Sequence, residues 1–188
     1  EHYNDASQTG NADEWQAYKD NWSTLAADFT QVSLTPGADD TQMNFAWYSE
    51  KTDGEATPVV HFGTDQENLE VFEGTAADVD TSLTGGTAYE YNHVTVTGLE
   101  PNTTYYYTVE KNGVETEVVE YATESADSVK ILYVGDPQVG ASVGQPQDGS
   151  ELENTEGEGN TAAMNDGFGW NRTLNIATTE NPDLSFVI

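Results

Sequence analysis

The sequence Gly-Leu-Glu-Pro-Asn-Thr-Thr-Tyr-Tyr-Tyr-Thr-Val, residues 98–109, combines a turn with a β-strand. The Gly, Pro and Asn of its first half favour a turn, and the aromatic and β-branched residues of its second half favour a strand. Asn112 and Gly113 follow soon after, and this pair is the strongest short-range signal for a two-residue β-hairpin. A turn, a strand and a hairpin in succession predict an antiparallel β-fold.

The same pattern extends over residues 29–123, where short alternating runs are separated by turn residues. We expect strands at 29–35, 42–48, 58–63, 69–72, 93–97, 105–109 and 117–123. The expected core comprises Val32, Phe45, Trp47, Val60, Phe62, Val94, Val96, Leu99, Tyr105, Tyr107 and Val109. Seven short strands over this length predict a mainly β domain built as a sandwich of two sheets.

Residues 1–28 form a polar N-terminal leader with a different pattern. Trp15, Tyr18, Trp22 and Leu25 are spaced by three and four residues, which predicts a short amphipathic helix. Such a helix either packs on the domain that follows or is simply a structured leader. The spacing of the apolar residues is compatible with both alternatives.

A polar linker at residues 124–128 separates the sandwich from residues 129–188. The continuous apolar run at 129–134 predicts a strand buried on both faces of a sheet. A glycine-rich acidic loop follows at 139–160, then a helix over 168–179 with Asp166 as its N-cap, then a second buried strand from residue 183. One β-α-β unit cannot form a stable sheet alone, so we expect an incomplete α/β domain and a truncated chain.

The composition limits the classes of function. The sequence has 34 acidic residues against 5 basic ones, a formal net charge of −29, and its basic residues are scattered singly. Such an acidic surface repels polyanions, so nucleic acid and anionic membranes are not expected partners. The sequence has no cysteine, which excludes disulfides and thiolate metal sites. We expect no membrane span, because no apolar run is long enough.

Asp136 and Gln138 are the candidate metal ligands. Asp136 closely follows the first apolar strand, at the carboxyl edge where α/β proteins bind ligands. Carboxylate and amide oxygens suit hard cations, and Pro137 stiffens the turn between the two side chains. An aspartate after a strand also acts as a turn former, so this short motif alone leaves both interpretations open.

Other polar candidates have less support. His2, His61 and His93 are far apart in sequence and lack metal-ligand spacing, so we expect them to have packing or surface roles. Gly157 and Gly159 lie in the acidic loop, without the preceding strand that a dinucleotide-binding loop requires. We therefore assign no catalytic residue, and the substrate-binding residues remain unknown.

Two segments resemble known families. Residues 98–109 resemble the corner of fibronectin type III domains, where a Leu and a Pro precede a Tyr whose hydroxyl bonds back across the corner. A fibronectin-III-like sandwich, a linker and then Val-Lys-Ile-Leu-Tyr-Val-Gly-Asp-Pro-Gln (residues 129–138) resemble the purple acid phosphatases among the calcineurin-like metallophosphoesterases. Residues 182–188 resemble the strand that precedes the next Gly-Asp motif of that superfamily.

This resemblance implies the start of an extracytoplasmic phosphatase, secreted or at the cell surface, which hydrolyses a small-molecule phosphoester with two metal ions (Fe, Zn or Mn). Asp136 matches the first carboxylate ligand of the family, and Gln138 stands where many members have His. The resemblance implies that the other ligands come from the remainder of the catalytic domain. The expected partners are therefore the phosphoester substrate and that remainder, and we expect residues 1–188 alone to be inactive. The alternative is a cell-surface fibronectin-III-like binding or spacer module.

Overall fold

The computed structural model of the protein describes residues 12–27, 31–54, 56–125, 127–145 and 161–188. These residues divide into two compact units. One comprises the described part of Asp28–Val129, and the other combines the described residues of Glu1–Ala27 and Lys130–Ile188.

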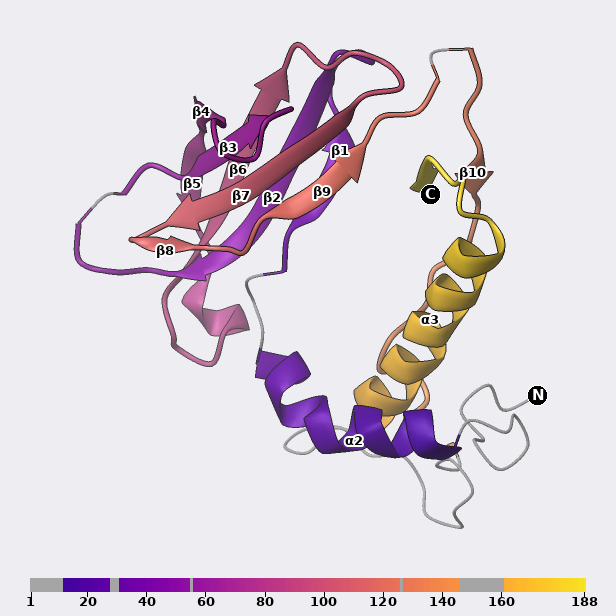
Figure 1. Ribbon diagram of the computed structural model, residues 1–188. Coiled ribbons are helices and arrows are strands. Elements are labelled where there is room, and N and C mark those ends of the chain that lie inside the picture. Colours follow the sequence, from indigo (N-terminus) through magenta and orange to yellow (C-terminus); the bar gives the residue numbers. More distant parts are fainter. Residues whose placement is uncertain (1–11, 28–30, 55, 126, 146–160) are drawn as a thin grey trace. The chain divides into compact units, whose positions relative to one another are not determined.

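The first unit is a sandwich of two antiparallel sheets (Figure 1). One sheet has the strand order β1-β2-β6-β5, and the other has the order β4-β3-β7-β8, with β9 also paired to β7. The strands are β1 (Ser33–Pro36), β2 (Gln42–Glu50), β3 (Val59–Gly63), β4 (Glu70–Glu73), β5 (Thr75–Asp78), β6 (Tyr89–Thr97), β7 (Thr104–Lys111), β8 (Val114–Glu115) and β9 (Val119–Ala122). A single 3₁₀ turn, Thr81–Leu83, precedes β6. The predicted fold class, a mainly β sandwich, is confirmed.

The core of the sandwich comes from the inward-facing residues of both sheets. Ten of the eleven predicted core residues are buried, Met43 is buried with them, and Val32 is partly buried against the cluster. The ring of Phe45 meets that of Tyr107 edge-on, with centroids 4.9 Å apart, and thereby joins β2 of one sheet to β7 of the other. Period-2 alternation identified this core because each strand has one buried face.

The strand pattern differs from the prediction in places, and β6 begins at Tyr89 rather than at residue 93. Strand β5 was missed, because its sequence Thr-Ala-Ala-Asp does not alternate and all four of its residues are exposed. The expected strand at 117–123 is β9, shorter than predicted, and the separate strand β8 forms the hairpin with β7. Asn112 and Gly113 have φ angles of 55° and 75°, as the predicted two-residue hairpin turn requires.

The predicted corner is present at the start of β7. The Tyr105 hydroxyl accepts a hydrogen bond from the backbone N–H of Glu100 at 2.8 Å, and Leu99 is buried beside it in the core. The hydroxyl reaches back five residues, so it ties the turn at residues 98–103 to the strand. This contact gives the turn a fixed position on the sandwich.

Replacing Tyr105 with phenylalanine is expected to destabilise the sandwich by about 0.5–1.5 kcal/mol, because the Glu100 N–H loses its acceptor while the buried ring is kept. Hydrogen exchange of the β7 amides measures this loss. Tyr106→Phe is the matched control, because the described residues provide no hydrogen-bond partner for the Tyr106 hydroxyl. Equal exchange rates in the two variants would contradict a stabilising role for the corner.

The second unit contains α2 (Ala12–Ala27), β10 (Ile131–Leu132), α3 (Thr161–Glu180) and β11 (Phe186–Val187). Strands β10 and β11 are parallel, as a β-α-β connection requires, and the Val134 N–H donates to the Ile188 carbonyl at 2.8 Å. Lys130 and Asp183 pair at 2.7 Å where the two strands begin, and this hydrogen bond lowers the pKa of Asp183. The expected strand–helix–strand order is therefore observed.

Two features of this unit correct the sequence interpretation. Helix α3 begins at Thr161 and not near residue 168, so Asp166 lies inside the helix and is not its N-cap. The first strand is short, and within this structure it is not buried on both faces: Ile131 is 41% exposed and Tyr133 is 81% exposed. Among the described residues, no helix has the length and apolar character needed to cross a membrane.

Candidate functional site

The residues that follow β10 form a tight turn around Asp136. The Oδ1 atom of Asp136 accepts a hydrogen bond from the backbone N–H of Gln138 at 3.0 Å, which is the geometry of an Asx turn. Both side chains are exposed to solvent. The two predicted metal ligands therefore lie in one solvent-exposed turn.

Gln138 has an unusual backbone conformation. Its φ angle is 46°, in the left-handed region that costs a residue with a side chain about 1–2 kcal/mol. Its carbonyl accepts the Ala141 N–H at 2.9 Å, so a second turn begins where the first ends. Strained backbone of this kind is concentrated at functional sites, which makes the segment 136–141 a candidate by geometry as well as by sequence.

The donor set at this turn suits a metal ion only in part. Asp136 offers a carboxylate, and its Oδ2 atom has no hydrogen-bond partner among the described residues, while Gln138 offers a neutral amide oxygen. Such oxygens fit hard cations. Within the described ranges, no three His, Cys, Asp or Glu side chains are grouped to hold a metal ion. Assignment of Asp136 and Gln138 as ligands therefore remains a prediction.

Asp166 of α3 holds the loop that continues from this turn. Its Oδ2 atom accepts the backbone N–H groups of Gly140 at 2.8 Å and of Ser142 at 3.2 Å. This contact could not be predicted from the sequence, because more than twenty residues separate the partners, and Asp166 lies within α3 and not at the predicted N-cap. The side chain instead satisfies two donors of a segment with no regular secondary structure.

The remaining sequence candidates do not join this site. His61 Nδ1 lies 3.1 Å from Thr108 Oγ1 and 3.3 Å from Glu115 Oε1, on the outer face of the second sheet of the sandwich. His93 lies in β6 opposite Ala46 and Thr75. His2 and the acidic loop over 146–160, with Gly157 and Gly159, lie outside the described residues. A strand-packing role fits both described histidines.

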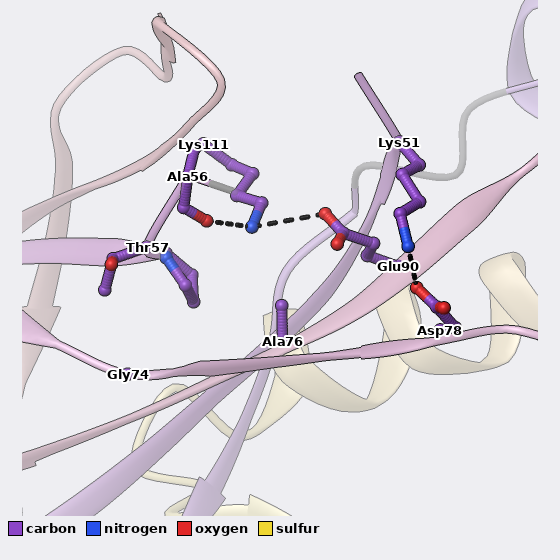
Figure 2. Close-up of a pocket in the computed structure, with 9 residues that line it drawn as sticks. Lys51, Ala56, Thr57, Gly74, Ala76, Asp78, Glu90 and Lys111 are labelled. Carbon is purple, nitrogen blue, oxygen red and sulfur yellow. Dashed lines mark hydrogen bonds and ion pairs between the residues drawn. The ribbon is translucent and has the colours of Figure 1, made fainter. Parts of the chain in front are cut away.

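A pocket of about 450 Å³ lies at one end of the sandwich (Figure 2). The Lys111 side chain is only 3% exposed, and its ammonium group lies 3.2 Å from Glu90 Oε2 and donates to the Ala56 carbonyl. Lys51 pairs with Asp78 on the other side of the pocket. Sequence reasoning missed this group, although Lys111 continues the inward-facing series of Tyr105, Tyr107 and Val109 in β7.

The charges in this pocket are compensated in pairs. Lys111 comes from β7 of one sheet and Glu90 from β6 of the other, so their ion pair joins the two sheets where the apolar core ends. The second pair is much more exposed, with side-chain exposures of 42% for Lys51 and 70% for Asp78. The two ion pairs therefore form a polar boundary where the apolar core ends.

Solved structures similar to this chain include a purple acid phosphatase. The structure of a purple acid phosphatase isolated from yellow lupin (Lupinus luteus) seeds is similar to 56% of this chain, with 18% sequence identity and a TM-score of 0.45. The similar part is 22% of that protein's chain. No curated protein sequence matches the chain.

The family comparison concerns the sandwich. The model of the purple acid phosphatase N-terminal domain matches residues 29–124, from the segment before β1 to just after β9. This confirms the resemblance seen in the sequence for that domain. Because the match covers more than half of the 188 residues, the chain belongs to the family of the purple acid phosphatase N-terminal domain.

Proposed function

We propose that this chain is the N-terminal part of a secreted, metal-dependent phosphoesterase whose complete form hydrolyses small-molecule phosphoesters at a dinuclear metal centre. The observation that carries the proposal is the order of the two structural units along the chain. A purple acid phosphatase N-terminal domain at 29–124 is followed directly by the parallel β10-α3-β11 unit. Residues 129–188 would then be the start of the catalytic domain, and residues 29–123 the sandwich that precedes it.

The exposure of the parallel strands supports this proposal. Apolar or aromatic side chains are exposed to solvent in both strands. They are Ile131 of β10, Tyr133 just after it, and Val187 of β11. Parallel sheets are normally covered on both faces, and a two-stranded one has little stability of its own. In a complete α/β domain, helices on the faces of a larger sheet would cover these side chains, and the remainder of that domain is the expected partner of this unit.

Asp136 would be the first carboxylate ligand in the complete site, with the Gln138 amide oxygen as a weaker second donor. The N–H of Gln138 holds Oδ1 of Asp136, which orients the carboxylate before any ion is bound. A dinuclear metal centre supplies Lewis-acid activation of the phosphoryl group and of the attacking water. The chain's own contribution in this segment is to fix the direction of one carboxylate.

The test uses the extended protein, which is the form with the catalytic-domain residues that the proposal expects after Ile188. Asp136→Asn is expected to lower the hydrolysis of an aryl phosphate more than about 100-fold and to reduce the metal content, because a charged ligand is lost. Gln138→His is expected to keep activity or to shift metal preference toward zinc. Asp127→Asn, which changes an exposed aspartate in the linker, should behave like the parent.

Two results would count against the proposal. Undiminished activity and metal content in the Asp136→Asn protein would refute the assignment of this site. An extended protein that binds no metal and hydrolyses no phosphoester would favour the alternative, a fibronectin-III-like binding or spacer module. Hydrogen exchange of the sandwich should be the same in the Asp136→Asn and Gln138→His proteins as in the parent, because both residues lie in the other compact unit.

A further inference from the structure

The loop that carries the candidate metal turn is held to helix α3 by one side chain. Asp166 Oδ2 accepts two backbone N–H groups, those of Gly140 and Ser142, as described above. Hydrogen bonds to a charged acceptor are stronger than those between neutral groups. These two bonds act on a segment with no strand or helix pairing of its own, where they determine where the chain runs after Gln138.

Helix α3 is in turn held at this position by the N-terminal helix α2. Trp15 and Phe168 are 5% and 4% exposed, and their ring centroids are 4.9 Å apart. Tyr18 packs on the same phenylalanine at 5.4 Å, and burial raises the pKa of its hydroxyl. At Gly167 a β-carbon would lie 2.7 Å from the Tyr18 hydroxyl oxygen, so α2 approaches the α3 backbone closely there.

These contacts form a continuous path from the N-terminal helix to the candidate ligands. Gly167 and Phe168, which α2 approaches closely, directly follow Asp166 in α3. Asp166 holds Gly140 and Ser142, and the turn that ends at Ala141 begins at Gln138. The helix that precedes the sandwich in sequence thus packs on the segment that follows the sandwich.

We propose that Asp166 is a positioning residue for the Asp136–Gln138 turn, and that α2 acts through it by fixing α3. The proposal rests on the proposed function for the metal role of the turn, but its structural part can be tested without metal. Helix α2 would then be a component of the catalytic unit and not an independent leader. Its effect on the candidate site would pass through Trp15, Phe168 and Asp166.

The first test measures amide hydrogen exchange by NMR in the 188-residue chain. Asp166→Ala is expected to speed exchange at Gly140 and Ser142 at least about 10-fold, since both lose their acceptor. Faster exchange at Gln138 is the decisive result, because its N–H donates to Asp136 and does not contact Asp166. Asp166→Asn keeps an acceptor oxygen and should restore most of the protection.

The second test changes α2 alone. Trp15→Ala is expected to speed exchange at Gly140, Ser142 and Gln138, while Glu14→Ala, at an exposed position of the same helix, should not. An unchanged Gln138 rate in both Asp166→Ala and Trp15→Ala would overturn the positioning role. In the extended protein, Asp166→Ala should also weaken Mn²⁺ binding, measured by calorimetry. If the unaltered extended protein binds no Mn²⁺, the proposed function fails, while the exchange data still decide the positioning role.

Discussion

Replacing Trp47 with alanine is expected to lower the free energy of unfolding of the sandwich by about 3–5 kcal/mol, as large truncations in a packed core do. The Trp47 side chain is 3% exposed and belongs to the cluster that fills the space between the sheets. Its backbone carbonyl also accepts a hydrogen bond from buried Asn92, on the neighbouring strand β6. Removal of the indole leaves a cavity that both sheets line and that neither can close.

Hydrogen exchange of β6 and β7 amides, followed by mass spectrometry, measures this change in the sandwich without contribution from the other unit. The matched control is Tyr48→Ala, the next residue in β2, whose side chain is 44% exposed. We expect that variant to lose less than about 1 kcal/mol, because its half-exposed ring packs on Tyr91 of the neighbouring strand and lies outside the core cluster. A cost below about 1 kcal/mol for Trp47→Ala would show that the ring is not part of the core.

Much of the sandwich could be predicted because its strands and turns are determined by residues close together in the sequence. Alternation placed Phe45 and Trp47 on the buried face of β2, and Asn112 with Gly113 located the hairpin. The corner at Tyr105 followed from a short motif whose partner, Glu100, lies only five residues away. In each case the deciding interaction involves neighbouring residues or the period of a single strand.

The features that were missed depend on contacts between distant segments. Asp166 was interpreted as a helix cap, because nothing in the sequence indicates that a loop more than twenty residues earlier needs its carboxylate. The early start of α3, at Thr161, lies in a run of small and polar residues without an apolar period. Strand β5 owes its existence to pairing with β6, because its own sequence has little strand character.

Lys111 was missed for a different reason. A lysine at the end of an alternating strand is normally taken to be exposed, because an isolated charge is costly to bury. Here Glu90 occupies an inward-facing position of the opposite sheet, and the Ala56 carbonyl supplies a further acceptor. Lys111 can be buried because its charge is paired with a charge from the other sheet. Alternation within one strand does not reveal such a pair.

Replacing Lys111 with methionine is expected to cost the sandwich about 3–5 kcal/mol, the usual effect of removing one partner of a buried ion pair. Methionine fills much of the volume, so the loss comes from Glu90, whose side chain is 14% exposed and would be left buried without the Lys111 ammonium. Exchange of β6 and β7 amides again measures the change. Lys51→Met is the control in the same pocket, and its exposed pair with Asp78 should contribute less than about 1 kcal/mol.

A double substitution separates the ion pair from simple packing. Glu90→Leu combined with Lys111→Met removes both charges, and the doubly substituted chain is expected to regain most of the stability that Lys111→Met alone loses. The reason is that the penalty of the single change is an uncompensated buried carboxylate, which the second change removes. If the double variant were as unstable as the sum of the two single ones, Lys111 would stabilise the sandwich through its aliphatic stem and the Ala56 contact, and the charge pair between the sheets would contribute nothing.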